Sequence, residues 1–149
     1  IAKSIDTRIL RESIRGLATK AYVNIPLDLE NATGSKLTPT NDGGIKIGKG
    51  VHKVLVSGRM SVKSGATSGS RHIRIIKNSY STANTLGWCD NNIEPNTQSN
   101  VIVTPLLADV EEDDIIYMSA YVLDSTDQIG GGSANLYGGR TSLTVEVVG

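Results

Sequence analysis

The sequence predicts an all-β protein, a sandwich of about eight to ten antiparallel strands that follows a short N-terminal helix. Three observations favour this class. Beyond residue 21, Gly, Ser, Thr and Asn become frequent and apolar residues switch to a spacing of two. Turn-forming residues interrupt that pattern at short, regular intervals. Phe is absent and aromatics make up only 4% of the chain, a composition that suits thin sheets of β-branched residues.

The helical pattern lies between Ser4 and Lys20, where apolar residues recur at helix-like spacings: Ile5, Ile9, Leu10, Ile14 and Leu17. A lone helix of this length is marginal in water, so its apolar side needs a partner. That partner is either a parallel bundle with copies of the same helix or the chain's own β-domain. The sequence thus divides into a helical neck at residues 1–21 and a head domain at residues 22–149.

The strands of the head domain are predicted in order from their alternating apolar residues. The clearest one covers residues 52–62 and places Val54, Val56, Met60 and Val62 on one face. The other predicted strands are residues 22–29, 45–47, 71–78, a short one around 86–89, 101–108, 114–123 and 142–148. Residues 31–44 are rich in Gly, Asn, Asp and Pro and predict turns.

The predicted strand at residues 114–123 differs from the others because it is apolar on both faces. Its second face carries four large apolar or aromatic side chains: Ile115, Tyr117, Tyr121 and Leu123. A strand buried on both faces must be covered twice, once by the core and once by another element. Burial of each such side chain stabilises by about 1.5–3 kcal/mol. We therefore expect a neighbouring subunit to cover this face, with the N-terminal helix as the alternative.

Charge and cysteine content exclude several classes of protein. Fifteen basic and fifteen acidic residues give a net charge of zero, which leaves no broad basic surface for nucleic acid. Cys89 is the single cysteine, so neither an intrachain disulfide nor a cysteine-built metal cluster is expected. Such a chain fits synthesis in a reducing cytoplasm. Since no apolar run reaches about 18 residues, membrane insertion is not expected.

No residue pattern points to catalysis. His52 and His72 lack acidic partners at metal-ligand spacing, and no serine lies in a G-x-S-x-G motif. We therefore predict that the protein is not an enzyme and takes no cofactor. A calcium site is a weaker alternative to a solvated turn, because hard oxygen ligands gather at Glu111, Asp113, Asp124 and Asp127.

The candidate binding patch surrounds Trp88, the only tryptophan, in a polar segment. Its predicted members are Tyr80, Trp88, Asp90, Asn91 and Asn92. Carbohydrate binding needs an aromatic face for the C–H side of a sugar and amide or carboxylate groups for its hydroxyls. The alternative is that Trp88 fills the edge of the sandwich or a seam between subunits.

Three stretches of the chain resemble the C1q/TNF-like jelly roll. Residues 44–60, Gly-Ile-Lys-Ile-Gly-Lys-Gly-Val-His-Lys-Val-Leu-Val-Ser-Gly-Arg-Met, resemble its short strand, glycine turn and long core strand. Residues 103–121 resemble its paired strands around an acidic turn, and residues 142–148 its closing strand. The resemblance covers residues 22–149 and implies a compact homotrimer with aromatic residues near the three-fold axis. Asp113 departs from the glycine usual at that turn.

The segment at residues 6–15, Asp-Thr-Arg-Ile-Leu-Arg-Glu-Ser-Ile-Arg, resembles the helical neck that precedes phage tail-fibre heads. This resemblance implies a receptor-binding protein of a phage tail fibre or baseplate, made in the bacterial cytoplasm and carried in the virion. It would join other fibre or baseplate components and adhere to a bacterial surface glycan or protein receptor. The alternatives are a structural trimerisation cap and a C1q-like adhesion domain on the bacterial cell surface.

Overall fold

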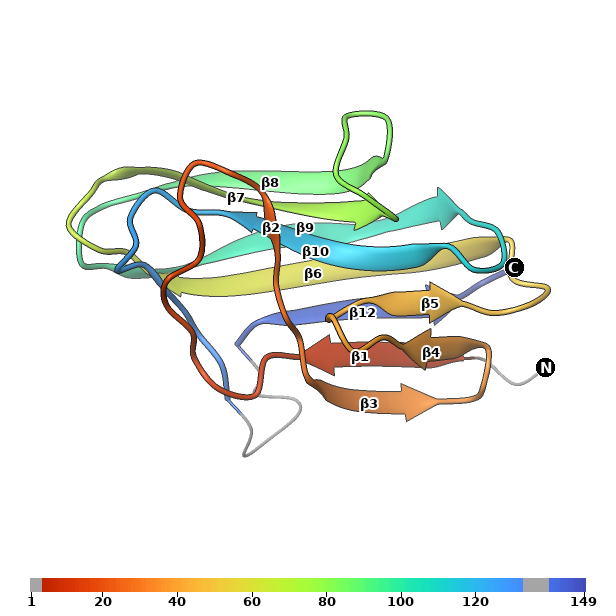
Figure 1. The fold of residues 1–149 in the computed structure, drawn as a ribbon. Coiled ribbons are helices and arrows are strands. Elements are labelled where there is room, and N and C mark those ends of the chain that lie inside the picture. Colours follow the sequence, from red (N-terminus) through yellow and green to blue (C-terminus); the bar gives the residue numbers. More distant parts are fainter. Residues whose placement is uncertain (1–3, 133–139) are drawn as a thin grey trace.

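The computed structural model describes residues 4–132 and 140–149 and shows two antiparallel sheets packed face to face (Figure 1). The first sheet has the order β9-β6-β12-β1-β3, with β11 also paired to β6. Its strands are β1 (Ile5–Ile9), β3 (Leu29–Thr33), β6 (Lys53–Lys63), β9 (Gln98–Asp109), β11 (Gln128–Ile129) and β12 (Ser142–Val147). The predicted two-sheet sandwich is confirmed.

The second sheet has the order β4-β5-β10-β7-β8, and β2 pairs with β10. Its strands are β2 (Val23–Asn24), β4 (Leu37–Pro39), β5 (Ile45–Ile47), β7 (Gly69–Lys77), β8 (Thr85–Ile93) and β10 (Ile115–Tyr121). Every described pair of strands in the two sheets is antiparallel. In the part of the chain that the structure describes, no helix is long and apolar enough to cross a bilayer.

The core lies between the sheets and follows the alternation of β6. Its buried side chains Val54, Val56, Met60 and Val62 belong to the main apolar cluster, as the sequence predicts. Gly58 lies on the same face, where a Cβ would come within 2.7 Å of the Met118 sulfur. The two sheets can therefore approach this closely only because residue 58 has no side chain.

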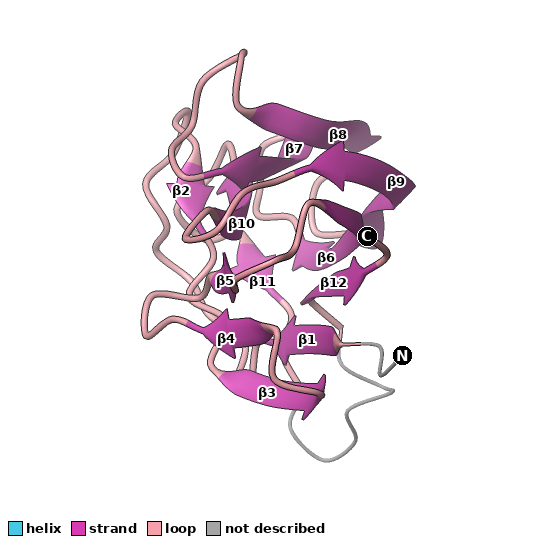
Figure 2. Cartoon of the chain, turned by 90° about the vertical axis from the view of Figure 1, so that its right-hand side faces the viewer, coloured by secondary structure: helices cyan, strands magenta, loops and turns pink. Residues whose placement is uncertain are grey.

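The predicted N-terminal helix is wrong, because residues 5–9 form strand β1 between β3 and β12 (Figure 2). Two pairing strands satisfy the backbone groups of β1, whereas a short helix would stand alone in water. The spacing of Ile5 and Ile9 fits a strand as well as a helix, since residues four apart also share a strand face. Residues 10–22 continue as irregular chain, and Gly16 has a φ of 79° that no helix contains.

The inner face of β1 is polar, which the sequence pattern does not predict. Arg8 is 5% exposed and donates hydrogen bonds to the carbonyl oxygens of Leu27 (2.7 Å) and Gly44 (2.9 Å). Asp6 is fully buried, and neither carboxylate oxygen has a hydrogen-bond partner among the described residues. Burial, together with the charge of Glu30, raises the pKa of Asp6 to about 7.

Several strand boundaries also differ from the sequence prediction. The strand expected at residues 22–29 is split into β2 and the start of β3, and β4 lies inside the predicted turn region. Strand β8 is longer than the short strand expected at residues 86–89. Strand β5 has the predicted bounds. The bounds of β2 and β4 are set by pairing across the sheet, which local sequence does not encode.

A buried ion pair joins β7 to the segment between β10 and β11. The guanidinium of Arg71 donates to both carboxylate oxygens of Asp127 at 2.8 and 3.0 Å, and both side chains are fully buried. Asp127 also accepts from the backbone N–H groups of Gly65 (2.7 Å) and Leu123 (3.2 Å). The carboxylate thereby ties residues 65–71 to residues 123–127, two segments that are distant in sequence.

We expect Asp127→Ala to lower the free energy of unfolding by about 3–5 kcal/mol, because Arg71 would keep a buried charge without a partner. Urea unfolding at pH 7 measures this loss. Glu112→Ala removes an exposed carboxylate instead and should change stability by less than about 0.5 kcal/mol. A loss below about 1 kcal/mol for Asp127→Ala would contradict the role given to the ion pair.

We expect Asp6→Asn to remove a pH-dependent loss of stability. The pKa of Asp6 is raised in the folded protein from 3.8 to about 7, so its contribution is fully present below pH 3.8 and is lost as the pH rises through 7. Relative to Asp6→Asn, the natural chain should lose roughly 2–4 kcal/mol between pH 4 and pH 8. Urea midpoints at both pH values give the comparison, and parallel pH profiles would show that Asp6 does not titrate as described.

Candidate functional site

The candidate site lies on the outer face of β7 and β8. Alternation directs Ile73 and Ile75 of β7 into the core, so the residues between them point outward. On this outer face Arg74 is paired with Trp88, and His72 with Asp90. The register of the two strands therefore gathers two charged side chains, an imidazole and an indole on one surface.

A cleft of about 250 Å³ opens on this surface, lined by Arg74, Tyr80, Thr82, Thr85 and Trp88. Trp88 is 63% exposed and Tyr80 is 48% exposed, so both rings offer apolar area to solvent. The loop between β7 and β8, which stands above the sheet (Figure 1), carries Tyr80 and Thr82. The Thr85 hydroxyl donates to the Ser81 carbonyl at 2.8 Å and holds the loop close to β8.

A group of aromatic rings packs against Tyr80, one of the residues that line the cleft. Tyr22 stacks on Tyr80 with ring centroids 4.3 Å apart and an interplanar angle of 20°. His72 stacks on Tyr121 at 4.7 Å and 14°, and the Tyr22 hydroxyl lies 2.9 Å from His72 Nδ1. Tyr22 comes from the irregular N-terminal segment and Tyr121 from the end of β10. Three separate parts of the chain thus hold the Tyr80 wall in place.

The charged groups of the site are linked to each other. Arg74 Nη1 donates to Asp90 Oδ1 at 2.8 Å, and the Arg74 guanidinium lies 5.2 Å from the Tyr22 ring centroid. His72 Nδ1 is 3.7 Å from the same Asp90 oxygen. Burial lowers the pKa of His72 below 6.5, Asp90 opposes this shift and Arg74 adds to it. His72 is therefore neutral at pH 7, and its Nδ1 can accept the hydrogen bond from Tyr22.

The structure brings only some of the five predicted binding residues together. Tyr80 and Trp88 line one cleft, and Asp90 reaches it through Arg74. Asn92 is exposed further along the same face of β8. Asn91 points away from the cleft, since its Nδ2 donates to the Asn100 carbonyl at 3.0 Å.

Sequence reasoning missed four residues of the site: Tyr22, Arg74, Thr82 and Thr85. The alternation of residues 71–78 indicated that Arg74 faces outward. Which strand lies beside it depends on sheet order, and no signal in the sequence gives that order.

The four side chains predicted to face a second subunit are partly covered by their own chain. Tyr117 is 7% exposed and donates to Asp42 Oδ2 at 3.0 Å, while Tyr121 stacks on His72. Ile115 and Leu123 are half-buried. Irregular segments of the chain supply this cover, in place of the helix named as the alternative. The interface role of these residues stays a prediction.

Two apolar side chains on the first sheet are more exposed than these four. Leu107 is 60% exposed and Ile102 is 51% exposed, both on the outer face of β9. Leu107 is opposite Leu55 of β6 in the ladder, and Ile102 is opposite Arg59. This surface, which we call the β9 face, is defined by Leu55, Ile102 and Leu107.

Three of the four residues named for a weak calcium site already have other partners, and the fourth, Glu111, is exposed. Asp127 is paired with Arg71, and Asp113 lies 3.3 Å from Lys46 Nζ. Asp124 accepts from the Thr126 backbone N–H and hydroxyl, which hold the pKa of Asp124 down at about 2. Within residues 4–132 and 140–149, no three His, Cys, Asp or Glu side chains are grouped to hold a metal ion.

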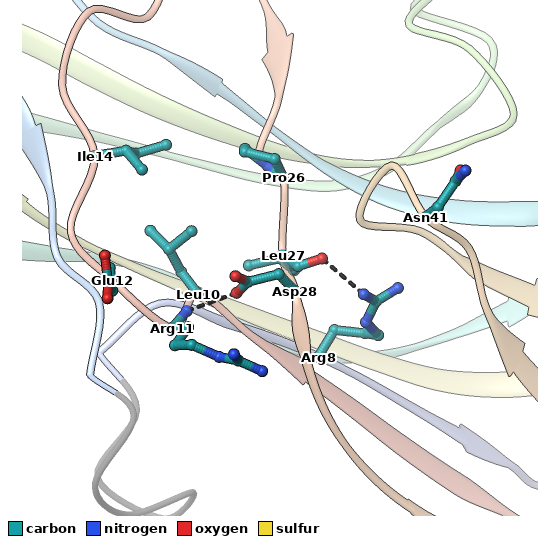
Figure 3. Close-up of a pocket in the computed structure, with 9 residues that line it drawn as sticks. All are labelled: Arg8, Leu10, Arg11, Glu12, Ile14, Pro26, Leu27, Asp28 and Asn41. Carbon is teal, nitrogen blue, oxygen red and sulfur yellow. Dashed lines mark hydrogen bonds between the residues drawn. The ribbon is translucent and has the colours of Figure 1, made fainter.

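A larger groove of about 710 Å³ lies beside the start of the irregular N-terminal segment (Figure 3). Its charges are two arginines and two carboxylates, and the Arg11 backbone N–H donates to Asp28 at 2.8 Å. Arg8 is committed to backbone carbonyls. Arg8 and Asp28 thus bind local backbone groups, and none of the described residues that line the groove is aromatic. We therefore place the candidate site at the Trp88 cleft.

Comparison with known proteins finds similarity of structure only. No protein-family model matches the sequence, and no curated protein matches it. Murine APRIL at pH 5.0 is similar with a TM-score of 0.69 and 9% identity, over 98% of this chain and 99% of that one. Eiger TNF from S. frugiperda is similar with a TM-score of 0.70 and 9% identity, over 99% of this chain and 93% of that one.

The globular domain of the zebrafish complement 1qA protein is also similar, with a TM-score of 0.64 and 8% identity, over 97% of this chain and 95% of that one. Matches of this extent at such low identity show the fold and nothing finer. The described residues therefore form a C1q/TNF-like jelly roll, which is the fold that the sequence resemblance implied.

Proposed function

We propose that this chain is the head of a trimeric adhesion protein that binds a surface glycan in the Trp88 cleft. The observation that carries this proposal is the pairing of two exposed rings, Trp88 and Tyr80, across a cleft whose other walls are polar. The indole offers a flat apolar face to the C–H side of a sugar ring. The hydroxyls of Thr82 and Thr85 and the guanidinium of Arg74 can bond the sugar hydroxyls.

Binding rather than catalysis is the activity that this arrangement supports. The one histidine near the cleft, His72, is stacked on Tyr121 and bonded to Tyr22. The one carboxylate, Asp90, is bonded to Arg74. The described residues that line the cleft include no second histidine or carboxylate to face either group, as a hydrolytic site needs.

Assembly through the β9 face is the second part of the proposal. Leu107 is 60% exposed opposite Leu55, and Ile102 is 51% exposed opposite Arg59. Contact between copies would remove the apolar area of these side chains from water. Three weak sites on one rigid head can bind a surface about 10²–10⁴ times more tightly than one site. A structural cap that only trimerises is the competing function, and the same exposed leucine and isoleucine favour it.

The setting we propose is the tip of a phage tail fibre or baseplate, with the bacterial cell surface as the alternative. Residues 6–15, whose likeness to a helical neck suggested the phage setting, lie in β1 and the chain after it. The setting thus enters the proposal from the sequence resemblance alone. Adsorption of the labelled protein to bacterial cells tests it together with glycan binding.

We expect Trp88→Ala to lower glycan binding at least about tenfold, since stacked apolar and hydrogen-bonded contacts of one ring are worth about 1.4 kcal/mol or more. A glycan array and adsorption to bacterial cells measure the loss. Trp88→Tyr keeps an aromatic face and should retain most binding. If Trp88→Ala binds glycans and cells as the natural chain does, the cleft is not the adhesion site.

We expect Leu107→Asp to convert the trimer to monomers, because it places a charge within the apolar contact between copies. Light scattering on the isolated chain gives the mass. Trp88→Asp is the matched control, since it changes an equally exposed apolar side chain on the other sheet and should leave the trimer intact. A monomeric natural chain, or a trimeric Leu107→Asp variant, would contradict assembly through the β9 face.

A further inference from the structure

Arg74, which lines the cleft, uses only some of its hydrogen-bond donors within the described protein. Arg74 Nη1 donates to Asp90 Oδ1 at 2.8 Å and to the Ile73 carbonyl at 3.3 Å. Nε and Nη2 have no hydrogen-bond partner among the described residues, and neither atom is fully buried. Both donors therefore reach solvent, although the Arg74 side chain as a whole is 16% exposed, and this side chain lines the cleft together with Tyr80 and Trp88.

Nε–H and one Nη2–H of a guanidinium lie parallel and match the two oxygens of a carboxylate or phosphate group. The Tyr22 ring beneath the guanidinium, 5.2 Å from its centre, and the bond to Asp90 hold the fork in one orientation. Arg74 is the only charged side chain among the described residues that line the cleft. A preoriented fork in a cleft with no lining carboxylate favours a ligand that carries negative charge.

We propose that the Trp88 cleft selects an anionic saccharide, whose carboxylate or phosphate oxygens bind the two open donors of Arg74 while its ring stacks on Trp88. This inference rests on the proposed glycan binding and adds the charge of the ligand. Arg74 is the residue that determines specificity, and Trp88 supplies affinity for neutral and anionic sugars alike. Asp90 weakens the binding of an anionic ligand to Arg74, because a negatively charged oxygen of Asp90 already lies 2.8 Å from Arg74 Nη1.

A glycan array with matched neutral and anionic members tests the charge of the ligand. It should carry galactosides and galacturonides, glucosides and glucuronides, and glucosides beside their 6-phosphates. The natural chain should bind the anionic member of at least one pair about tenfold more tightly or better, as charge-assisted bidentate bonds imply. The uronide and phosphate arms distinguish a carboxylate from a phosphate ligand.

Variants separate specificity from folding. Arg74→Gln should bind the neutral and anionic members of each pair about equally, because it removes the charge, while its lost bonds to sugar hydroxyls weaken both members alike. Arg74→Lys keeps the charge without the fork and should reduce the preference several-fold, which covers the case in which Arg74→Gln does not fold. Asp90→Asn should increase the preference for anionic over neutral members of each pair, an effect that a merely structural role would not produce.

Each result decides between the two proposals. Equal binding of neutral and anionic members by the natural chain would overturn the anionic preference and leave glycan binding intact. An anionic preference that survives in both Arg74 variants would show that another residue determines it. Absence of binding to every glycan would overturn the proposed function and this inference together.

Discussion

The buried ion pair between Arg71 and Asp127 is the interaction on which the candidate site depends. It fixes which side chains of β7 point inward, because a shift of one residue would expose Arg71 and leave Asp127 buried without its cation. With Arg71, Ile73 and Ile75 inside, His72 and Arg74 must face outward. The same carboxylate holds Gly65 and Leu123, so the loops at this end of the sandwich are fixed with the strand.

The cleft follows from that register and from two irregular segments. Strand β8 adds Trp88 and Asp90 beside Arg74 and His72, and the loop between β7 and β8 adds Tyr80. The N-terminal segment brings Tyr22 between the Tyr80 and Tyr121 rings. A regular sheet thus positions the charged groups, and less regular chain supplies the rings, which is the usual division of roles between scaffold and loops.

Sequence reasoning found the fold class and the long strands because apolar residues alternate clearly in β6 and occupy both faces of β10. It failed at β1, whose inner face carries Asp6 and Arg8, since buried charges break the pattern that distinguishes a strand from a helix. It selected Trp88 and Tyr80 as candidates from their polar surroundings, and the structure brings both to one cleft. It missed Arg74 and Tyr22 because their place beside Trp88 depends on strand order and on a long irregular segment.

The central claim is that ligands bind at the Trp88 cleft. NMR titration of the isotope-labelled chain with a glycan that it binds tests this most directly, because the chain contains one tryptophan and its indole N–H signal is unambiguous. The account predicts that the Trp88 indole and Arg74 Nε–H signals shift together and saturate at one ligand concentration. Shifts confined to the groove lined by Arg11 and Asp28, or to the β9 face, would contradict it.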